Sequence, residues 1–92
     1  FANSVDNQSN GTLAANDGLV LTTSGLLQNS GNGLIHSENA GVTITAGTLD
    51  NNGGRIAAKA GDAQIDATDF NNGSGALFAR DRVHLTGMNV DN

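Results

Sequence analysis

Short stretches along the chain alternate apolar and polar residues with a period of two. The clearest are "VTIT" at Val42–Thr45, "AQID" at Ala63–Asp66 and "VHLT" at Val83–Thr86. Such alternation is typical of a β-strand with one buried face, whereas every window that approaches a helical period is interrupted by Gly. The sequence therefore predicts an all-β protein.

The same short pattern returns about every 20 residues. An apolar residue precedes an Asn-rich turn at Val5, Leu27, Leu49, Phe70 and Val90, with spacings of 22, 22, 21 and 20 residues. Asn, Gly, Asp and Ser fill the segments between the apolar positions, and they turn the chain because they tolerate positive φ or cap their own backbone. Self-similarity at this period indicates a solenoid.

Period and strand pattern together predict a parallel β-helix with three short strands in each coil. We expect one segment over residues 1–92, with coils at approximately 5–26, 27–48, 49–69 and 70–89. Four coils at roughly 4.8 Å each would make a stack of about 19 Å. A leucine-rich horseshoe shares the period, but it needs a helix or a longer convex segment, and the sequence offers neither.

Stacking places residues one period apart in the same column. Phe70 stands in the column of Leu27 and Leu49, so we expect the core to widen there. The other inward columns are Leu13, Ile35, Ile56 and Leu77; Leu21, Ile44, Ile65 and Leu85; and a small-residue corner of Ala15, Ser37, Ala58 and Ala79. Because each coil buries few side chains, stability should be approximately a sum over coil interfaces.

Asn recurs at one turn position in every coil. The members of this column are Asn7, Asn29, Asn51, Asn72 and Asn92. Side-chain amides stacked at strand spacing can hydrogen-bond to one another and to the turn backbone. We therefore interpret this column as a structural Asn ladder, in which each Asn provides the hydrogen bonds that the same corner needs in every coil. We prefer this interpretation to a binding site.

Composition excludes several classes of function. The chain has 92 residues, a net charge of −5, four basic residues and no Cys. Nucleic-acid binding needs clustered basic residues or aromatic platforms, and thiol chemistry needs Cys. We expect no nucleic-acid partner, no cofactor and no metal. Because Phe1 and Asn92 both fall inside the repeat, we also expect the chain to be a segment of a longer protein.

Two stretches carry a family resemblance. "LDNNGGRIAA" from Leu49 and "AQIDATDFNNGSGAL" from Ala63 resemble the haemagglutinin repeats of filamentous haemagglutinin. Such repeats belong to exoproteins of two-partner secretion, including adhesins and contact-dependent growth inhibition effectors. The resemblance implies a right-handed β-helical shaft, secreted or held at the cell surface of a Gram-negative bacterium after export through an outer-membrane β-barrel transporter.

The resemblance leaves two functions open. The first is a structural shaft that projects a distal adhesive or toxin-delivering region, with flanking coils of the parent chain as its partners. The second is a binding module, in which a face of the β-helix itself binds a host glycan or a receptor on a host or target cell. Because the end coils should present unpaired strand edges, end-to-end self-association of the chain is also expected.

The sequence gives no support to an enzyme or a metal site. Catalytic carboxylates would have to share a column in adjacent coils, but Asp66 and Asp69 have Thr and Asn as their expected neighbours. A calcium site is conceivable only around Asp62, Asp66 or Asp69, and the nonapeptide spacing of calcium-binding repeats is absent. We expect no catalytic residues. His36 and His84 should both point outward into solvent.

Charged and aromatic residues of the outer surface are the remaining candidates. Column equivalence predicts that Glu38 faces Lys59, and that Asp62 faces Arg82. Phe78 stands at an outward position beside the inward Leu77, which is unusual for an aromatic residue. With Arg80 and Arg82 it forms the candidate contact patch of the last coil: Phe78, Arg80 and Arg82.

Overall fold

The structure is a computed structural model that describes residues 4–91, and every regular element in that range is a β-strand. All strand pairs are parallel and join residues about one coil apart. The strands are β1 (Val5–Asp6), β2 (Thr12–Ala15), β3 (Leu19–Thr22), β4 (Leu26–Gln28), β5 (Leu34–Ser37), β6 (Val42–Asp50), β7 (Arg55–Ala58), β8 (Asp62–Asn71), β9 (Ala76–Ala79), β10 (Arg82–Thr86) and β11 (Asn89–Asp91).

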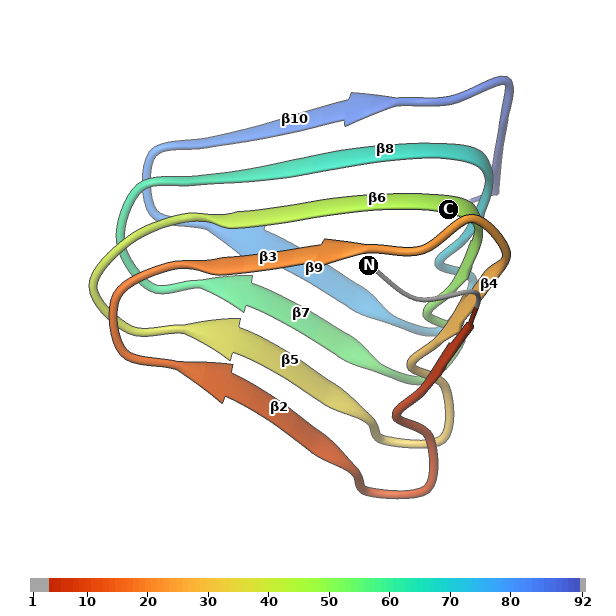
Figure 1. Ribbon diagram of the computed structural model, residues 1–92, viewed down its shortest axis with the longest axis horizontal. Coiled ribbons are helices and arrows are strands. Elements are labelled where there is room, and N and C mark those ends of the chain that lie inside the picture. Colours follow the sequence, from red (N-terminus) through yellow and green to blue (C-terminus); the bar gives the residue numbers. More distant parts are fainter. Residues whose placement is uncertain (1–3, 92) are drawn as a thin grey trace.

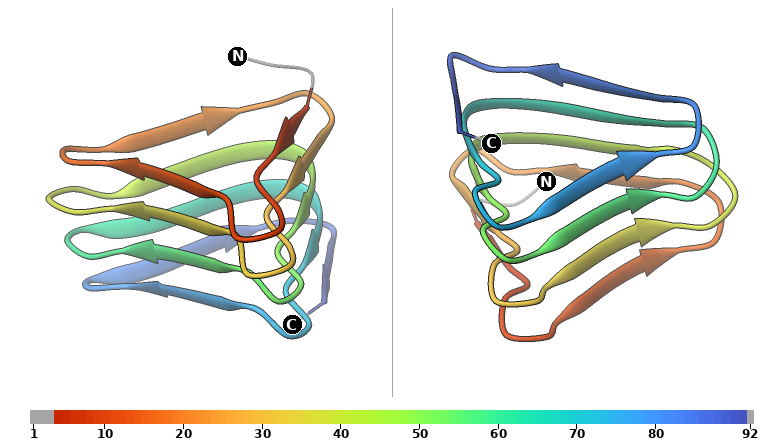
Figure 2. Two further views of the ribbon diagram at one scale, coloured as in Figure 1. Left: turned by 90° about the horizontal axis from the view of Figure 1, so that it is seen from below. Right: turned by 180° about the vertical axis from the view of Figure 1, so that it is seen from behind.

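The strands wind into a solenoid of roughly triangular outline (Figure 1). In that view the chain runs clockwise as it recedes from the red first coil to the blue last coil, so the winding is right-handed. Figure 2 shows the same coils stacked from one end to the other. The predicted right-handed parallel β-helix of about four coils is therefore confirmed. The stack is about as wide as it is long, with extents of 27 × 26 × 26 Å.

Three faces make up the solenoid. The first face is the sheet β2-β5-β7-β9, and the second contains β3, β6, β8 and β10. The third contains β1, β4, the later parts of β6 and β8, and β11. Because β6 and β8 run through the corner between the second and third faces, these two faces form one continuous sheet.

The predicted columns are present in the register of all three faces. Ile35 pairs with Ile56 on the first face, and Ile44 with Ile65 on the second. Leu49 pairs with Phe70 on the third face. The side chains of the middle coils are fully buried, while their equivalents in the first and last coils are partly covered or exposed. The core is therefore a set of aliphatic columns that needs a coil on each side to close.

Three separate strands per coil are present in only two of the four coils. Three separate short strands occur in the first and last coils, as expected, whereas β6 and β8 of the two middle coils each span nine or ten residues and serve as both the second and the third strand. The first coil has one more residue at this corner, and the oxygen of Gly25 accepts backbone hydrogen bonds from both Gly47 and Thr48, each at 3.1 Å. This bulge interrupts the ladder there, while the tighter corner leaves it continuous in β6 and β8.

The corners absorb all of the variation in coil length. Val5 to Leu13 is a step of eight residues, whereas the equivalent step from Leu49 to Ile56 is seven. The longer turn adds a left-handed residue, with Asn10 at a φ of 70°. The strand registers before and after the corner are unchanged, so an extra turn residue does not shift the columns.

Candidate functional site

A line of side-chain amides follows the corner between the third and first faces. The Nδ2 atom of Asn7 donates to Oδ1 of Asn29 at 2.7 Å, Asn29 donates to Asn51 at 2.8 Å, and Asn51 donates to Asn72 at 2.7 Å. All four side chains are buried. The structure thus brings together four of the five Asn of the predicted ladder, and Asn92 lies outside the described residues.

The amides of Asn7, Asn29 and Asn51 also anchor the backbone of the next coil. Asn7 donates to the carbonyl oxygen of Leu34 at 3.0 Å, Asn29 to that of Arg55 at 3.1 Å and Asn51 to that of Ala76 at 3.1 Å. These oxygens belong to residues at equivalent positions, each the first residue of a strand of the first face. The ladder therefore joins adjacent coils through both side chains and backbone, which is a structural role.

The ladder requires a Gly at the end of the turn. A Cβ atom on Gly54 would lie 1.8 Å from the carbonyl oxygen of Asn29, and one on Gly75 would lie 2.0 Å from that of Asn51. No side chain fits at such distances. The close approach of successive turns therefore requires Gly at this point of the corner, whether it stands four residues after the ladder Asn, as Gly33 does, or three, as Gly54 does.

Phe78 lies against a residue that the sequence reasoning missed. The guanidinium carbon of Arg55 is 4.8 Å from the centroid of the Phe78 ring. Arg55 is directly opposite Ala76 in the register, so it reaches Phe78 diagonally. Diagonal neighbours on a sheet are within reach of long side chains, and an Arg over an aromatic ring is attracted by the ring quadrupole. This diagonal step is the signal in the sequence that could have found the pair.

A hollow of about 160 Å³ lies beside this pair on the outer side of the first face. Its floor is Ala57, which lies between His36 and Phe78 in one outward column and is only 2% exposed. Arg55 and Lys59 add two cations to the lining. A small residue between two rings thus creates a recess with a cationic wall, which we call the Ala57 hollow.

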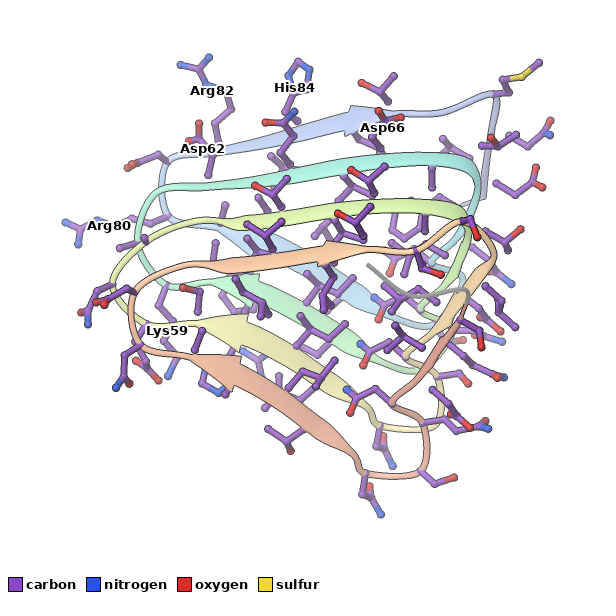
Figure 3. All side chains as sticks on the ribbon, viewed as in Figure 1. Lys59, Asp62, Asp66, Arg80, Arg82 and His84 are labelled. Carbon is purple, nitrogen blue, oxygen red and sulfur yellow. The ribbon has the colours of Figure 1, made fainter. Side chains whose placement is uncertain are left out.

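The candidate contact patch is divided between two faces. Phe78 lies in β9 on the first face and is 38% exposed. Arg80 follows β9 at the corner, and Arg82 opens β10 on the second face. Figure 3 shows Arg80 at the corner and Arg82 on the outer side of β10. Phe78 is therefore grouped with Arg55 and the Ala57 hollow, and not with Arg82.

The two histidines differ in environment. His84 is exposed on β10, as expected. His36 is also on the outer side of its sheet, but its side chain is only 16% exposed, which corrects the expectation that it points into solvent. Its Nδ1 atom is buried and has no hydrogen-bond partner within residues 4–91, although Oε1 of Glu38 lies 3.5 Å away.

The predicted charge pairs are both in register, but only one forms an ion pair. The Nζ atom of Lys59 lies 3.2 Å from Oε1 of Glu38. Arg82 is directly opposite Asp62, yet no ion pair between them is present in the structure. Lys59 and Glu38 are 53% and 41% exposed, so their pair contributes little stability, at most about 1 kcal/mol.

The carboxylates remain separated by polar neutral residues. Asp66 lies between Thr45 and Thr86, and the Oδ1 atom of Asp69 accepts a hydrogen bond from Asn89 at 2.7 Å. Across residues 4–91, no three His, Cys, Asp or Glu side chains gather closely enough to hold a metal ion. The described chain likewise contains no helix long and apolar enough to cross a membrane.

Comparison with known proteins agrees with this architecture. The family model described as the haemagglutinin repeat matches residues 2–87. No curated protein and no solved structure matches the chain. The match covers nearly the whole sequence, and the structure shows the repeat as stacked coils in register. The chain therefore belongs to the haemagglutinin repeat family.

Proposed function

We propose that the chain is a shaft segment of a filamentous haemagglutinin-like adhesin that is exported by two-partner secretion and projects a distal region from the cell surface. The family supports the adhesin part of this proposal. The observation that carries the shaft role is the Asn ladder, because a continuous line of buried hydrogen bonds joins every described coil to the next. Export through a dedicated outer-membrane transporter is part of the same proposal.

Rigidity is the mechanism of a shaft. Each interior coil is joined to its neighbours by backbone hydrogen bonds on three faces, by the aliphatic columns and by the ladder amides. Bending the rod would open one of these interfaces while compressing another, and packed side chains resist both. Because every interface repeats the same columns and backbone ladders, rod length follows coil number.

Duplication of two coils tests the shaft directly. A chain that carries residues 27–69 twice in tandem keeps the column equivalence at the new junction, because Leu27 and Phe70 occupy the same position in their coils. Small-angle scattering should show a particle about 10 Å longer with the same cross-section. A thicker or expanded particle would contradict the rigid-rod mechanism.

A second candidate function, binding through a face of the β-helix, is supported by the Ala57 hollow. It combines an exposed aromatic edge, an Arg above the ring and a Lys within one recess on a chain of net charge −5. Such a recess fits an anionic group attached to a flat or apolar body. Host-cell glycans and receptors are the ligands considered.

A binding screen with matched variants decides between the two functions. The purified chain, an Ala57→Leu variant that fills the hollow and an Ala14→Leu variant at the equivalent outward position of the first coil would be tested on glycan arrays and cells. Circular dichroism should show equal β content in all three. Absence of saturable binding supports the shaft. Binding that Ala57→Leu abolishes and Ala14→Leu retains would establish the binding module instead.

A further inference from the structure

Asn is followed directly by Gly at one corner of every coil. The four dipeptides are Asn10–Gly11, Asn32–Gly33, Asn52–Gly53 and Asn72–Gly73. Asn before Gly is especially prone to lose its side-chain amide spontaneously, because Gly has no Cβ to hinder attack of its backbone nitrogen on the Asn side chain. The structure makes these four dipeptides unequal, although their sequences are identical.

The first difference lies in the nitrogen that would attack. Three of the four Gly residues donate their N–H to an oxygen of the same turn, and the acceptors belong to Gln8, Ser30 and Asn71, at 3.3, 3.3 and 3.1 Å. The N–H of Gly53 donates to no residue that the structure describes. The nitrogen attacks after losing its proton, and a donated hydrogen bond retains that proton. Gly53 therefore carries the nitrogen that is readiest to react.

The second difference lies in the Asn residue. Asn10 and Asn32 have φ values of 70° and 69°. In this left-handed conformation the next nitrogen lies roughly opposite Cβ, so the side chain meets it only after a large rotation. The buried Oδ1 atom of Asn72 accepts a hydrogen bond from Asn51 at 2.7 Å, which fixes that side chain in the ladder. Asn52 is exposed and has a negative φ, so neither restriction applies to it.

We propose that Asn52 is a site of spontaneous deamidation in the folded protein, while the fold protects the other three dipeptides. The Gly53 nitrogen bonds to Cγ of Asn52 and gives up its proton, and the bond from Cγ to Nδ2 breaks, so that ammonia leaves with that proton. Water then opens the resulting succinimide ring at either carbonyl carbon. The product is an aspartate or an isoaspartate at position 52, and the only co-reactant is water.

The adjacent coil supplies a group that promotes this step. The N–H of Ser74 donates to Oδ1 of Asn52 at 3.2 Å. Negative charge develops on this oxygen when Cγ becomes tetrahedral, and a fixed N–H donor stabilises such charge as in an oxyanion hole. On the other side of the corner, the backbone oxygen of Asn52 accepts a hydrogen bond from Gly31 at 3.2 Å. The site therefore lies between two described coils.

The corner can accommodate either product. An aspartate keeps an oxygen that can accept from Ser74, and an isoaspartate adds one carbon to the backbone at a corner that is a whole residue longer in the preceding coil. Each product also adds one negative charge to a chain of net charge −5. That charge would arise beside a hollow of about 400 Å³ whose lining includes Gly53 and Arg55. We therefore expect the columns to stay in register while the corner becomes more acidic.

The test is mass spectrometry of the folded chain during incubation at neutral pH in water labelled with heavy oxygen, with fragmentation of the intact chain to assign each Asn. Asn52 should deamidate about tenfold faster than Asn32, because only Gly33 must first give up a hydrogen bond. In urea the two rates should become similar, because unfolding removes the differences between the corners. Equal rates in the folded chain, or loss at Asn52 only in urea, would overturn the proposal.

Two variants give an independent measurement by ion-exchange chromatography, with folding checked by circular dichroism. Asn52→Gln should remove most of the acidic species that accumulates with time, because the longer side chain does not form the five-membered ring. Asn32→Gly, which tolerates the positive φ of that position, should leave the species unchanged. Its rate of formation should rise with pH, because the attacking nitrogen must lose its proton. An acidic species that persists in Asn52→Gln and disappears in Asn32→Gly would overturn the proposal.

Discussion

Replacing Asn51 by Ala removes three hydrogen bonds from the centre of the molecule. The Asn51 side chain accepts from Asn29 at 2.8 Å and donates to Oδ1 of Asn72 at 2.7 Å and to the oxygen of Ala76 at 3.1 Å. It is 0% exposed, so water does not replace these bonds without entering the core. At about 1 kcal/mol for each bond, the free energy of unfolding should fall by about 3 kcal/mol.

The loss should be larger if the space left by Asn51 stays dry. One proton of Asn29 Nδ2 and the Oδ1 atom of Asn72 would then each lose the bond to Asn51, and an unsatisfied buried group costs about 1–3 kcal/mol. The upper end of the expected loss is therefore about 6 kcal/mol, which is comparable to the whole stability of a small domain. A water molecule bound in the gap would hold the loss near 3 kcal/mol.

Asn7→Ala provides the matched control. Asn7 makes two of these bonds, to Asn29 and to the oxygen of Leu34, and it lies at the end of the ladder with 6% exposure. Its loss should be about 2 kcal/mol. Urea unfolding followed by far-ultraviolet circular dichroism is the assay, because the chain has no Trp or Tyr. If Asn51→Ala is no more destabilising than Asn7→Ala at equal m-values, the ladder does not hold the coils together.

Two further predictions concern the turns and the surface. Gly54→Ala should lower the free energy of unfolding by about 3 kcal/mol, because its Cβ would meet the oxygen of Asn29 at 1.8 Å. The control Gly18→Ala, whose Cβ would have its nearest contact at 3.8 Å, should change the free energy of unfolding by less than about 1 kcal/mol. Equal effects of the two variants in urea unfolding would exclude close approach as the reason for Gly54. A double-mutant cycle of Glu38→Gln and Lys59→Gln should give a coupling energy of about 0.5 kcal/mol that disappears in 1 M NaCl, because the pair is exposed to solvent. A larger coupling energy that does not change with salt would contradict this assignment of a weak surface ion pair.

The sequence predicted the columns well because a solenoid turns sequence spacing into spatial contact. Once the period is known, a residue such as Ile44 has only two candidates above and below it, and the register agrees with both. The same reasoning identified Glu38 and Lys59 as neighbours and placed four Asn in one ladder. Column equivalence therefore predicts contacts between residues at the same position in adjacent coils.

Contacts that leave the column were harder to predict. The stacking of Arg55 on Phe78 is diagonal, and the His36 side chain is only 16% exposed although it lies on the outer side of its sheet. The length of β6 depends on whether the corner at Ala46 and Gly47 interrupts the backbone hydrogen bonds. Neither of these small residues gives a sequence signal that a strand ends or continues there. These features follow from side-chain reach and local backbone geometry, which the repeat period does not specify.

The ability of the corners to absorb single residues has a genetic consequence. Because the strand registers stay the same whether a corner has the longer or the shorter form, unequal recombination between adjacent repeats would add or remove one whole coil and leave every remaining interface intact. A population can thus vary the length of such a shaft in steps of about 4.8 Å without passing through a variant that fails to fold. Selection then acts on length as a quantity independent of the fold.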